Sequence, residues 1–277
     1  MKSNQTLLIL SNSTNPVGAN SIFNYCAQNS IDSRLIDLDD PSLISILNSD
    51  LPKKLICRMN PSSYYKYKKL SSAINNLNAK SVINATLRAF NKVDSAGILT
   101  ENKIPVPETH VISNINESAL LAAPLVLKPS VGNQGKGVVL AQTTAQIVSY
   151  SKELLYTNEN FLAQEYIEES KGSDKRLFVV GDKVVAAMKR VAKSGDFRAN
   201  IHLGAHAEKY KPTDEEVLLA CKATRVHQLS FAGVDIIDSN KGPLVLEVNP
   251  SPGFGISIIS GIDVVSKVVE FLMKEKE

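Results

Sequence analysis

The chain has 277 residues, 43% of them hydrophobic, and a formal net charge of +3 at pH 7. This length and apolar content predict two or three packed units and argue against disorder, and so small a charge excess permits an anionic ligand without indicating direct DNA binding. The apolar runs are too short to span a bilayer and the first residues lack the apolar core of a signal peptide, so we expect a cytoplasmic protein.

Residues 1–84 alternate between stretches typical of strands and stretches typical of helices. We expect strands at 6–10, 33–38 and 54–58, and helices at 19–28 and 41–48. Such alternation indicates an α/β domain built on a parallel sheet. This part of the chain contains no GxGxxG sequence, so nothing in it indicates a dinucleotide site.

Residues 85–163 predict a second unit, which contains a glycine-rich loop. We expect helices at 92–99 and 144–156, strands at 124–128 and 138–141, and the loop at 130–137 between these two strands. Pro105 and Pro107 indicate an extended segment after the first helix, because each proline disfavours helix in the residue before it.

Residues 164–277 predict a third, mixed unit. We expect strands at 161–166, 176–180, 183–189, 234–237 and 244–248, and helices at 213–229 and 262–274. Thr213 and Glu216 have the spacing of a capping box, in which each side chain bonds to the backbone N–H of the other residue. The short turn at 239–242 predicts that the last two strands pair with each other.

The loop at 130–137 and the lysine before it are typical of a phosphate site. Glycines let backbone N–H groups approach phosphate oxygens, and Lys128 would bring a compact positive charge to the same place. The loop lacks the Gly-Lys-Ser/Thr ending of a Walker A sequence. Taken alone, a glycine-rich hairpin beside a surface lysine would explain the same residues.

Asp235, Glu247 and Asn249 predict a cation site. Glu247 and Asn249 are two residues apart in one expected strand and therefore point to the same side, and Asp235 lies in the neighbouring strand. Oxygen donors so placed suit Mg²⁺, which binds few protein oxygens and takes its other ligands from phosphates and water. Two incidental, solvated carboxylates are the alternative, and the apolar residues around them make it the weaker one.

One surface cluster, residues 64–69, interleaves three tyrosines with three lysines. Such a cluster could stack on the bases of single-stranded or ribosomal RNA. It is more often typical of a solvated helix face whose lysine stems cover apolar surface. The composition favours the second interpretation.

Several motifs together resemble the ATP-grasp superfamily and, within it, the RimK-type ligases that add glutamate to the C-terminus of a small-subunit ribosomal protein. The resemblance covers the chain from about residue 84 to its end. It is carried by NK (91–92), LVLK (125–128), GNQGKGVVL (132–140), QEYI (164–167), DKR (174–176), VVGDKVVAA (179–187), GDFRANIH (195–202), AGVDI (232–236), EVNPSPG (247–253) and SGID (260–263). It implies an ATP-grasp fold, of class α/β and α+β, in which residues 1–84 form a pre-ATP-grasp parallel-sheet domain and residues 85–163 and 164–277 form two subdomains that grip ATP.

The resemblance also implies a role for each matching residue. Lys92 and Lys128 would hold the ATP phosphates, and Arg198 and Asn200 would face the γ-phosphate and the reacting carboxyl group, Arg198 being the catalytic residue. The remaining positions would be Glu165 and Tyr166 at adenine, Asp174 at the ribose, and Asp235, Glu247 and Asn249 on Mg²⁺ or Mn²⁺.

The implied activity is ATP-dependent ligation of a carboxylate to an amine through an acyl phosphate. The expected substrates are L-glutamate or another amino acid and the C-terminus of a ribosomal protein or peptide. Two alternatives stay open: a ligase acting on a small-molecule coenzyme or carrier protein, and a non-catalytic nucleotide-binding module associated with the ribosome. The resemblance also points to a homo-oligomer.

Overall fold

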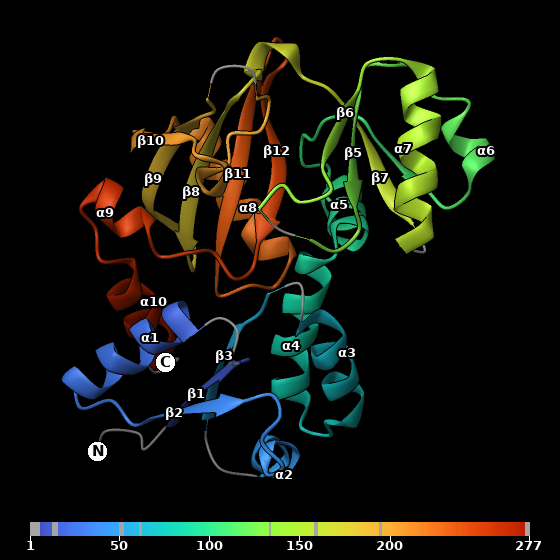
Figure 1. The fold of residues 1–277 in the computed structure, drawn as a ribbon. Coiled ribbons are helices and arrows are strands. Elements are labelled where there is room, and N and C mark those ends of the chain that lie inside the picture. Colours follow the sequence, from blue (N-terminus) through green and yellow to red (C-terminus); the bar gives the residue numbers. More distant parts are fainter. Residues whose placement is uncertain are drawn as a thin grey trace.

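The computed structural model describes residues 6–12, 16–49, 53–60, 63–132, 134–157, 160–193 and 196–274. These residues form three sheets with helices packed against them (Figure 1). No helix among them is long and apolar enough to cross a membrane.

The N-terminal unit is built on a parallel three-stranded sheet, as predicted. Its strands are β1 (Thr6–Ser11), β2 (Ser33–Asp37) and β3 (Lys53–Arg58), in the order β2-β1-β3. Parallel neighbours need crossover connections, which α1 (Pro16–Gln28) and α2 (Leu43–Asn48) supply. Because all three strands run the same way, their carboxyl ends meet at one edge of the sheet, where Arg58 ends β3.

Three helices connect this sheet to the rest of the chain: α3 (Tyr64–Ala73), α4 (Leu77–Phe90) and α5 (Lys92–Glu101). The predicted boundary between residues 84 and 85 falls within α4, which continues through it. The predicted domain boundaries stay predictions.

Helix α3 carries the cluster of tyrosines and lysines. Tyr64 and Tyr67 are buried in the N-terminal core, where the Tyr67 hydroxyl donates to the Leu10 carbonyl at 3.0 Å. Tyr65 is exposed, and Lys66 forms an ion pair with Asp39. Two of the three rings therefore pack inside the protein, as expected for an amphipathic helix, and are not free to stack on bases.

The middle unit is an antiparallel sheet in the order β4-β7-β5-β6. Its elements are β4 (Thr109–Ile112), α6 (Ile115–Ser118), β5 (Leu125–Pro129), β6 (Val139–Ala141), α7 (Thr144–Thr157) and β7 (Phe161–Glu165). Helix α7 packs on one face of the sheet (Figure 1) and contributes Ile147 and Leu154 to the core of this unit. The glycine-rich loop joins β5 to β6, as predicted.

The C-terminal unit is a five-stranded antiparallel sheet in the order β10-β9-β8-β11-β12. Its elements are β8 (Ser173–Val180), β9 (Lys183–Val191), β10 (His206–Lys209), α8 (Asp214–Val226), β11 (Phe231–Ser239), β12 (Gly242–Asn249), α9 (Ile256–Ser260) and α10 (Val264–Met273). The predicted capping box of Thr213 and Glu216 opens α8. The last helix returns to the N-terminal unit, where α10 packs against α1 in a core shared by both sheets (Figure 1).

Candidate active site

The three predicted cation ligands lie on the hairpin of β11 and β12. The strand register pairs Asp235 with Glu247 and Gly233 with Asn249. Directly opposed residues of antiparallel strands point to the same face of the sheet. Glu247 and Asn249 are two residues apart in β12, so both point to the face that Asp235 also occupies. The structure therefore brings Asp235, Glu247 and Asn249 together, as the short turn between their strands predicted.

Two arginines that were not singled out from the sequence bind Asp235. Arg176 on β8 donates from Nε and Nη2 to the two carboxylate oxygens, both at 2.6 Å, and Arg190 on β9 donates from Nη2 at 2.8 Å. Burial alone would raise the pKa of Asp235, but the two guanidinium groups lower it below its usual range. The carboxyl group of Asp235 is therefore ionised at neutral pH and could serve as a hard oxygen donor to a cation.

Asp174, predicted to contact the ribose, lies in the same network. Arg190 donates from Nε and Nη2 to both carboxylate oxygens of Asp174, at 2.6 and 2.7 Å. Burial raises the pKa of Asp174, and Arg190 opposes this rise. Arg190 thus bridges Asp174 and Asp235, and the ribose contact stays a prediction.

Lys128 lies on β5 of the middle sheet and is partly buried. Its ammonium group donates to the Gln164 side-chain oxygen at 2.5 Å. Burial is the largest cause that lowers the pKa of Lys128, the charge of Lys92 adds to this shift, and the carboxylates of Glu247 and Asp235 oppose it, so the pKa lies at about 8. The predicted phosphate lysine of one sheet and the predicted metal carboxylates of another therefore interact electrostatically.

Lys92 is the first residue of α5, because the Asn91 side chain caps the first turn of that helix. Its backbone N–H donates to the Ser130 carbonyl at 2.8 Å, and its ammonium group donates to the Gly132 carbonyl at 2.7 Å. Lys92 thus holds the start of the glycine-rich loop.

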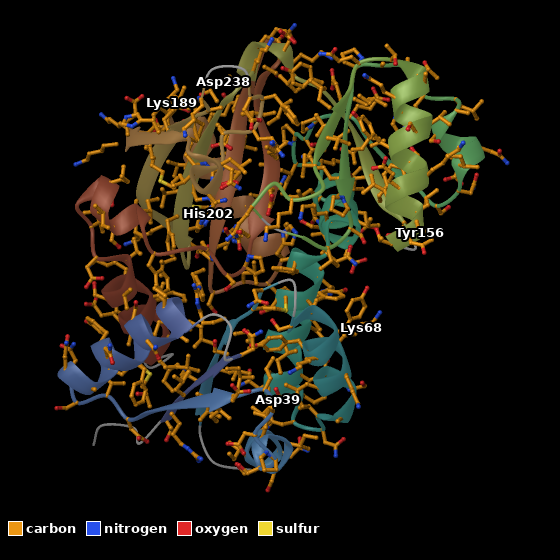
Figure 2. The ribbon with its side chains drawn as sticks, viewed as in Figure 1. Asp39, Lys68, Tyr156, Lys189, His202 and Asp238 are labelled. Atoms are coloured by element: carbon orange, nitrogen blue, oxygen red, sulfur yellow. The ribbon has the colours of Figure 1, made fainter. Side chains whose placement is uncertain are left out.

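Arg198 holds the far part of the same loop. Its Nη1 donates to the Gly135 carbonyl at 3.3 Å, and its Nη2 forms a 3.0 Å ion pair with Asp196. Asn200, two residues further on, accepts a hydrogen bond from the backbone N–H of His202, whose side chain is exposed (Figure 2). Arg198 and Asn200 therefore lie beside the loop, and the substrate contacts assigned to them stay predictions.

Glu165 and Tyr166, the predicted adenine contacts, lie where β7 leaves the middle sheet. The Glu165 backbone N–H donates to the Glu108 carbonyl at 2.8 Å, and the Tyr166 ring meets the Phe197 ring edge-on, with centroids 6.3 Å apart. The Tyr166 hydroxyl is buried and has no partner among the described residues. An unsatisfied hydroxyl at this place suits a ligand with polar edges such as adenine.

The residues present fit a magnesium–nucleotide complex. Asp235, Glu247 and Asn249 offer hard oxygen donors on one face, and the buried Ser251 hydroxyl beside them has no partner among the described residues. Within that part of the chain no group of three or more His, Cys, Asp or Glu could hold a metal ion by itself.

Sequence reasoning passed over Arg58, Gln164, Arg176 and Arg190. Arg58, Gln164 and Arg176 lie within stretches predicted as strands, and Arg190 directly follows another; each of the four has at least one apolar neighbour in the sequence. A charged or amide side chain in a buried strand requires a partner, and that requirement is the signal that could have identified them.

Comparison with known proteins relates the chain to a family and to solved structures. The model of the RimK-like ATP-grasp domain family matches residues 89–272. A "Probable alpha-L-glutamate ligase" of Legionella pneumophila (strain Corby) is 43% identical over 197 residues, which are 69% of this chain and 65% of that protein. "Probable alpha-L-glutamate ligase 1" of Shewanella sp. (strain MR-4) is 46% identical over 193 residues, which are 68% of this chain and 64% of that protein. The matched part of the chain therefore spans about two thirds of the length of these relatives.

Solved structures share the fold at low sequence identity. A RimK domain ATP-grasp protein of Sphaerobacter thermophilus DSM 20745 has a TM-score of 0.70 at 18% identity, covering 96% of this chain and 98% of that one. A D-cycloserine synthetase has a TM-score of 0.75 at 15% identity, covering 97% and 98%. The D-alanine–D-alanine ligase of Bacillus anthracis has a TM-score of 0.71 at 17% identity, covering 97% and 96%.

Proposed function

This chain belongs to the RimK-like ATP-grasp family, and from that premise we propose that it is an ATP-dependent carboxylate–amine ligase. The observation that carries the proposal is the strand register that sets Asp235 opposite Glu247, with Lys128 near enough to both for their charges to interact. A partly buried cation beside two carboxylates suits a nucleotide whose phosphates bind the lysine and whose metal ion binds the carboxylates.

The phosphates would be held by Lys92 and Lys128, with Arg198 and Asn200 at the γ-phosphate and the reacting carboxyl group. Mg²⁺, or Mn²⁺ in its place, would be bound by Asp235, Glu247 and Asn249. The hinge residues Glu165 and Tyr166 would contact adenine, and Asp174 the ribose.

An amine cannot readily displace oxide from a carboxylate, so the carboxylate must first be converted into a species with a better leaving group. ATP supplies a phosphoryl group and the metal ion neutralises its charge. A carboxylate oxygen attacks the γ-phosphorus, ADP leaves, and an acyl phosphate results. The amine then attacks the acyl carbon, the C–O bond to phosphate breaks, and the amine nitrogen loses a proton. Lys128 and Arg198 would stabilise the negative charge on the transferring group, and the route requires no nucleophile from the protein.

We propose L-glutamate as the amine substrate, which the names of the relatives support. The acceptor would be the C-terminus of a peptide or ribosomal protein. The deciding experiment incubates the protein with ATP, Mg²⁺, a ribosomal extract and each of the twenty amino acids, and measures ADP release and the masses of the products. Release that depends on L-glutamate, together with an acceptor heavier by glutamate residues, supports the proposal. The Glu247→Gln variant is the control that shows whether any ADP release comes from the proposed site. Absence of turnover with every amino acid would refute the proposal.

A further inference from the structure

Arg58 is a buried cation that has no carboxylate partner among the residues the structure describes. It ends β3, is 2% exposed, and donates from Nη2 to the Pro252 carbonyl at 3.0 Å. Its guanidinium carbon lies 4.5 Å from the centre of the Phe254 ring. Its Nε and Nη1 have no hydrogen-bond partner among the described residues.

This arrangement differs from that of the other arginines inside the protein. Arg176 and Arg190 each form ion pairs with carboxylates at 2.6–2.8 Å. Within the described part of the chain, the guanidinium group of Arg58 instead donates to one backbone carbonyl and lies over one aromatic ring. Burial lowers the pKa of Arg58 to about 10, so the group stays charged at neutral pH. A buried charge with unpaired N–H groups costs considerable free energy and indicates that an anion is missing from its surroundings.

The guanidinium group lies against the loop that follows the predicted metal ligands. Pro252 is three residues beyond Asn249, so their Cα atoms are at most about 11 Å apart. A side chain at Gly233 would place its Cβ 2.9 Å from Pro252, so this loop packs tightly on the strand of Asp235. The unpartnered Ser251 hydroxyl belongs to the same loop.

The first turn of α1 lies on another side of Arg58. A Cβ added at Gly18 would be 2.5 Å from Arg58 Nη2. The first N–H groups of a helix have no partner within the helix, and their dipoles favour a negative charge. Two positive features therefore converge at the carboxyl edge of a parallel sheet, where α/β folds commonly bind ligands.

We propose that Arg58, Ser251 and the first turn of α1 bind a non-reacting carboxylate of the amino-acid substrate. This inference rests on the proposed function. Lys92, Lys128 and Arg198 would be occupied by phosphates and the reacting carboxyl group, whereas an amino acid that attacks through its amine keeps its own carboxylates charged. One of them gives Arg58 the acceptor it lacks, and holds the amine at the metal side of the 249–254 loop.

The test titrates L-glutamate into protein saturated with ADP and Mg²⁺ by isothermal calorimetry, and measures ADP affinity separately. Arg58→Gln is expected to weaken L-glutamate about 10- to 100-fold, as for loss of a charged hydrogen bond, and to change ADP affinity by less than about twofold. Arg58→Lys keeps the charge but loses the planar guanidinium group, so its L-glutamate affinity is expected to lie between those of the wild type and Arg58→Gln. The exposed Arg225→Gln is the matched control and should bind both ligands normally.

Two amides identify which carboxylate is bound. L-glutamine lacks the side-chain carboxylate and L-isoglutamine lacks the α-carboxylate. The amide missing the group that Arg58 holds should bind wild-type protein weakly and lose nothing further in Arg58→Gln. If Arg58→Gln proves unstable in thermal melting, Arg58→Lys and Gly18→Ala, whose methyl group would displace Nη2, take its place.

Unchanged L-glutamate affinity in these variants would overturn the inference, as would an equal loss of ADP affinity, which would mark Arg58 as structural. If the wild-type protein does not bind L-glutamate, the other amino acids are titrated in the same way. An amino acid whose affinity depends on Arg58 would keep the carboxylate site and reject only the glutamate part of the proposed function. No such amino acid would reject the site.

Discussion

Asp235→Asn is expected to lower both stability and activity, whereas Glu247→Gln is expected to lower activity alone. Asp235 holds Arg176 through two hydrogen bonds and Arg190 through a third. Asparagine would leave Arg176 without a carboxylate partner among the described residues, while Arg190 keeps Asp174. The Glu247 side chain has no hydrogen bond or ion pair among the residues that the structure describes.

Breaking a buried ion pair costs about 3–5 kcal/mol, and the partner that Arg190 retains argues for the lower end, about 3 kcal/mol. For a chain of this size, that corresponds to a fall of roughly 6–12 °C in the apparent melting temperature. Glu247→Gln should cost less than about 1 kcal/mol. Both variants should lower kcat at least about 100-fold if the two carboxylates bind the metal ion.

The assay combines thermal unfolding, followed by circular dichroism, with ADP release at saturating substrates. Asp238→Asn is the matched control, because Asp238 lies on the same strand but is 61% exposed in its pair with Lys175 (Figure 2). The Lys175 ammonium group is buried, but it keeps its second carboxylate partner, Glu216, so loss of the exposed Asp238 charge should cost about 1 kcal/mol or less. Equal melting temperatures for Asp235→Asn and Glu247→Gln would refute the pairing of Asp235 with the two arginines.

Three further predictions concern the loop, its lysine and a buried histidine. Because burial lowers the pKa of Lys128 to about 8, ADP affinity should fall as the pH rises through about 8, and Lys128→Arg should remove this dependence in calorimetric titrations. His227 is buried and its pKa is lowered, so below about pH 6.5 the unfolded chain binds a proton that the folded chain does not. The free energy of unfolding should keep its full value above about pH 6.5 and decrease by up to about 1.4 kcal/mol per pH unit below that, measured by urea denaturation. Gly135→Ala should cost about 1 kcal/mol of stability in the same assay and lower kcat, because Gly135 has φ +71° and its Cβ would lie 3.4 Å from Arg198 Cδ.

The histidine and glycine predictions have controls in the same chain. The Ser95 hydroxyl lies 2.8 Å from His227 Nε2, and Nδ1 must donate to the Ala223 carbonyl, so the ring is neutral and accepts from Ser95. His227→Gln should therefore flatten the acid limb, and the exposed His202→Gln should leave it unchanged. Gly97→Ala, in a helix with free space around it, should not destabilise the protein.

Local patterns predicted most of the fold. Apolar stretches and their spacing located the strands of the three sheets except β4 and β10, and Thr213 with Glu216 located the start of α8. The final helix, expected at 262–274, is α10, which Asp263 caps. The short helix α9 before it, which ends at Gly261 with φ +75°, was not predicted. The exposed strand β10 was not predicted, since its residues show no apolar alternation.

The site was predictable to the extent that it is local. The two-residue turn predicts that β11 and β12 pair, and it sets their register from Ser239 to Ile236. Continued unchanged, this register would place Asp235 opposite Leu246, but an irregularity between Asp235 and Ile236 shifts it so that Glu247 lies opposite Asp235, which the sequence did not predict. The partners of Asp235 depend on β8 lying beside β11, a pairing between segments about sixty residues apart that no local pattern determines. The approach of Lys128 to Glu247 likewise depends on how two sheets pack against each other.

The hydrogen bonds of Lys92 and Arg198 to carbonyls of the glycine-rich loop have a consequence for turnover. If these side chains bind phosphates as proposed and exchange their bonds to Gly132 and Gly135 for bonds to phosphate oxygens, the net gain in affinity is smaller than the phosphate contact itself. The same bonds reform when ADP departs. The loop therefore competes with the product for its own cations, which weakens product inhibition and favours rapid release.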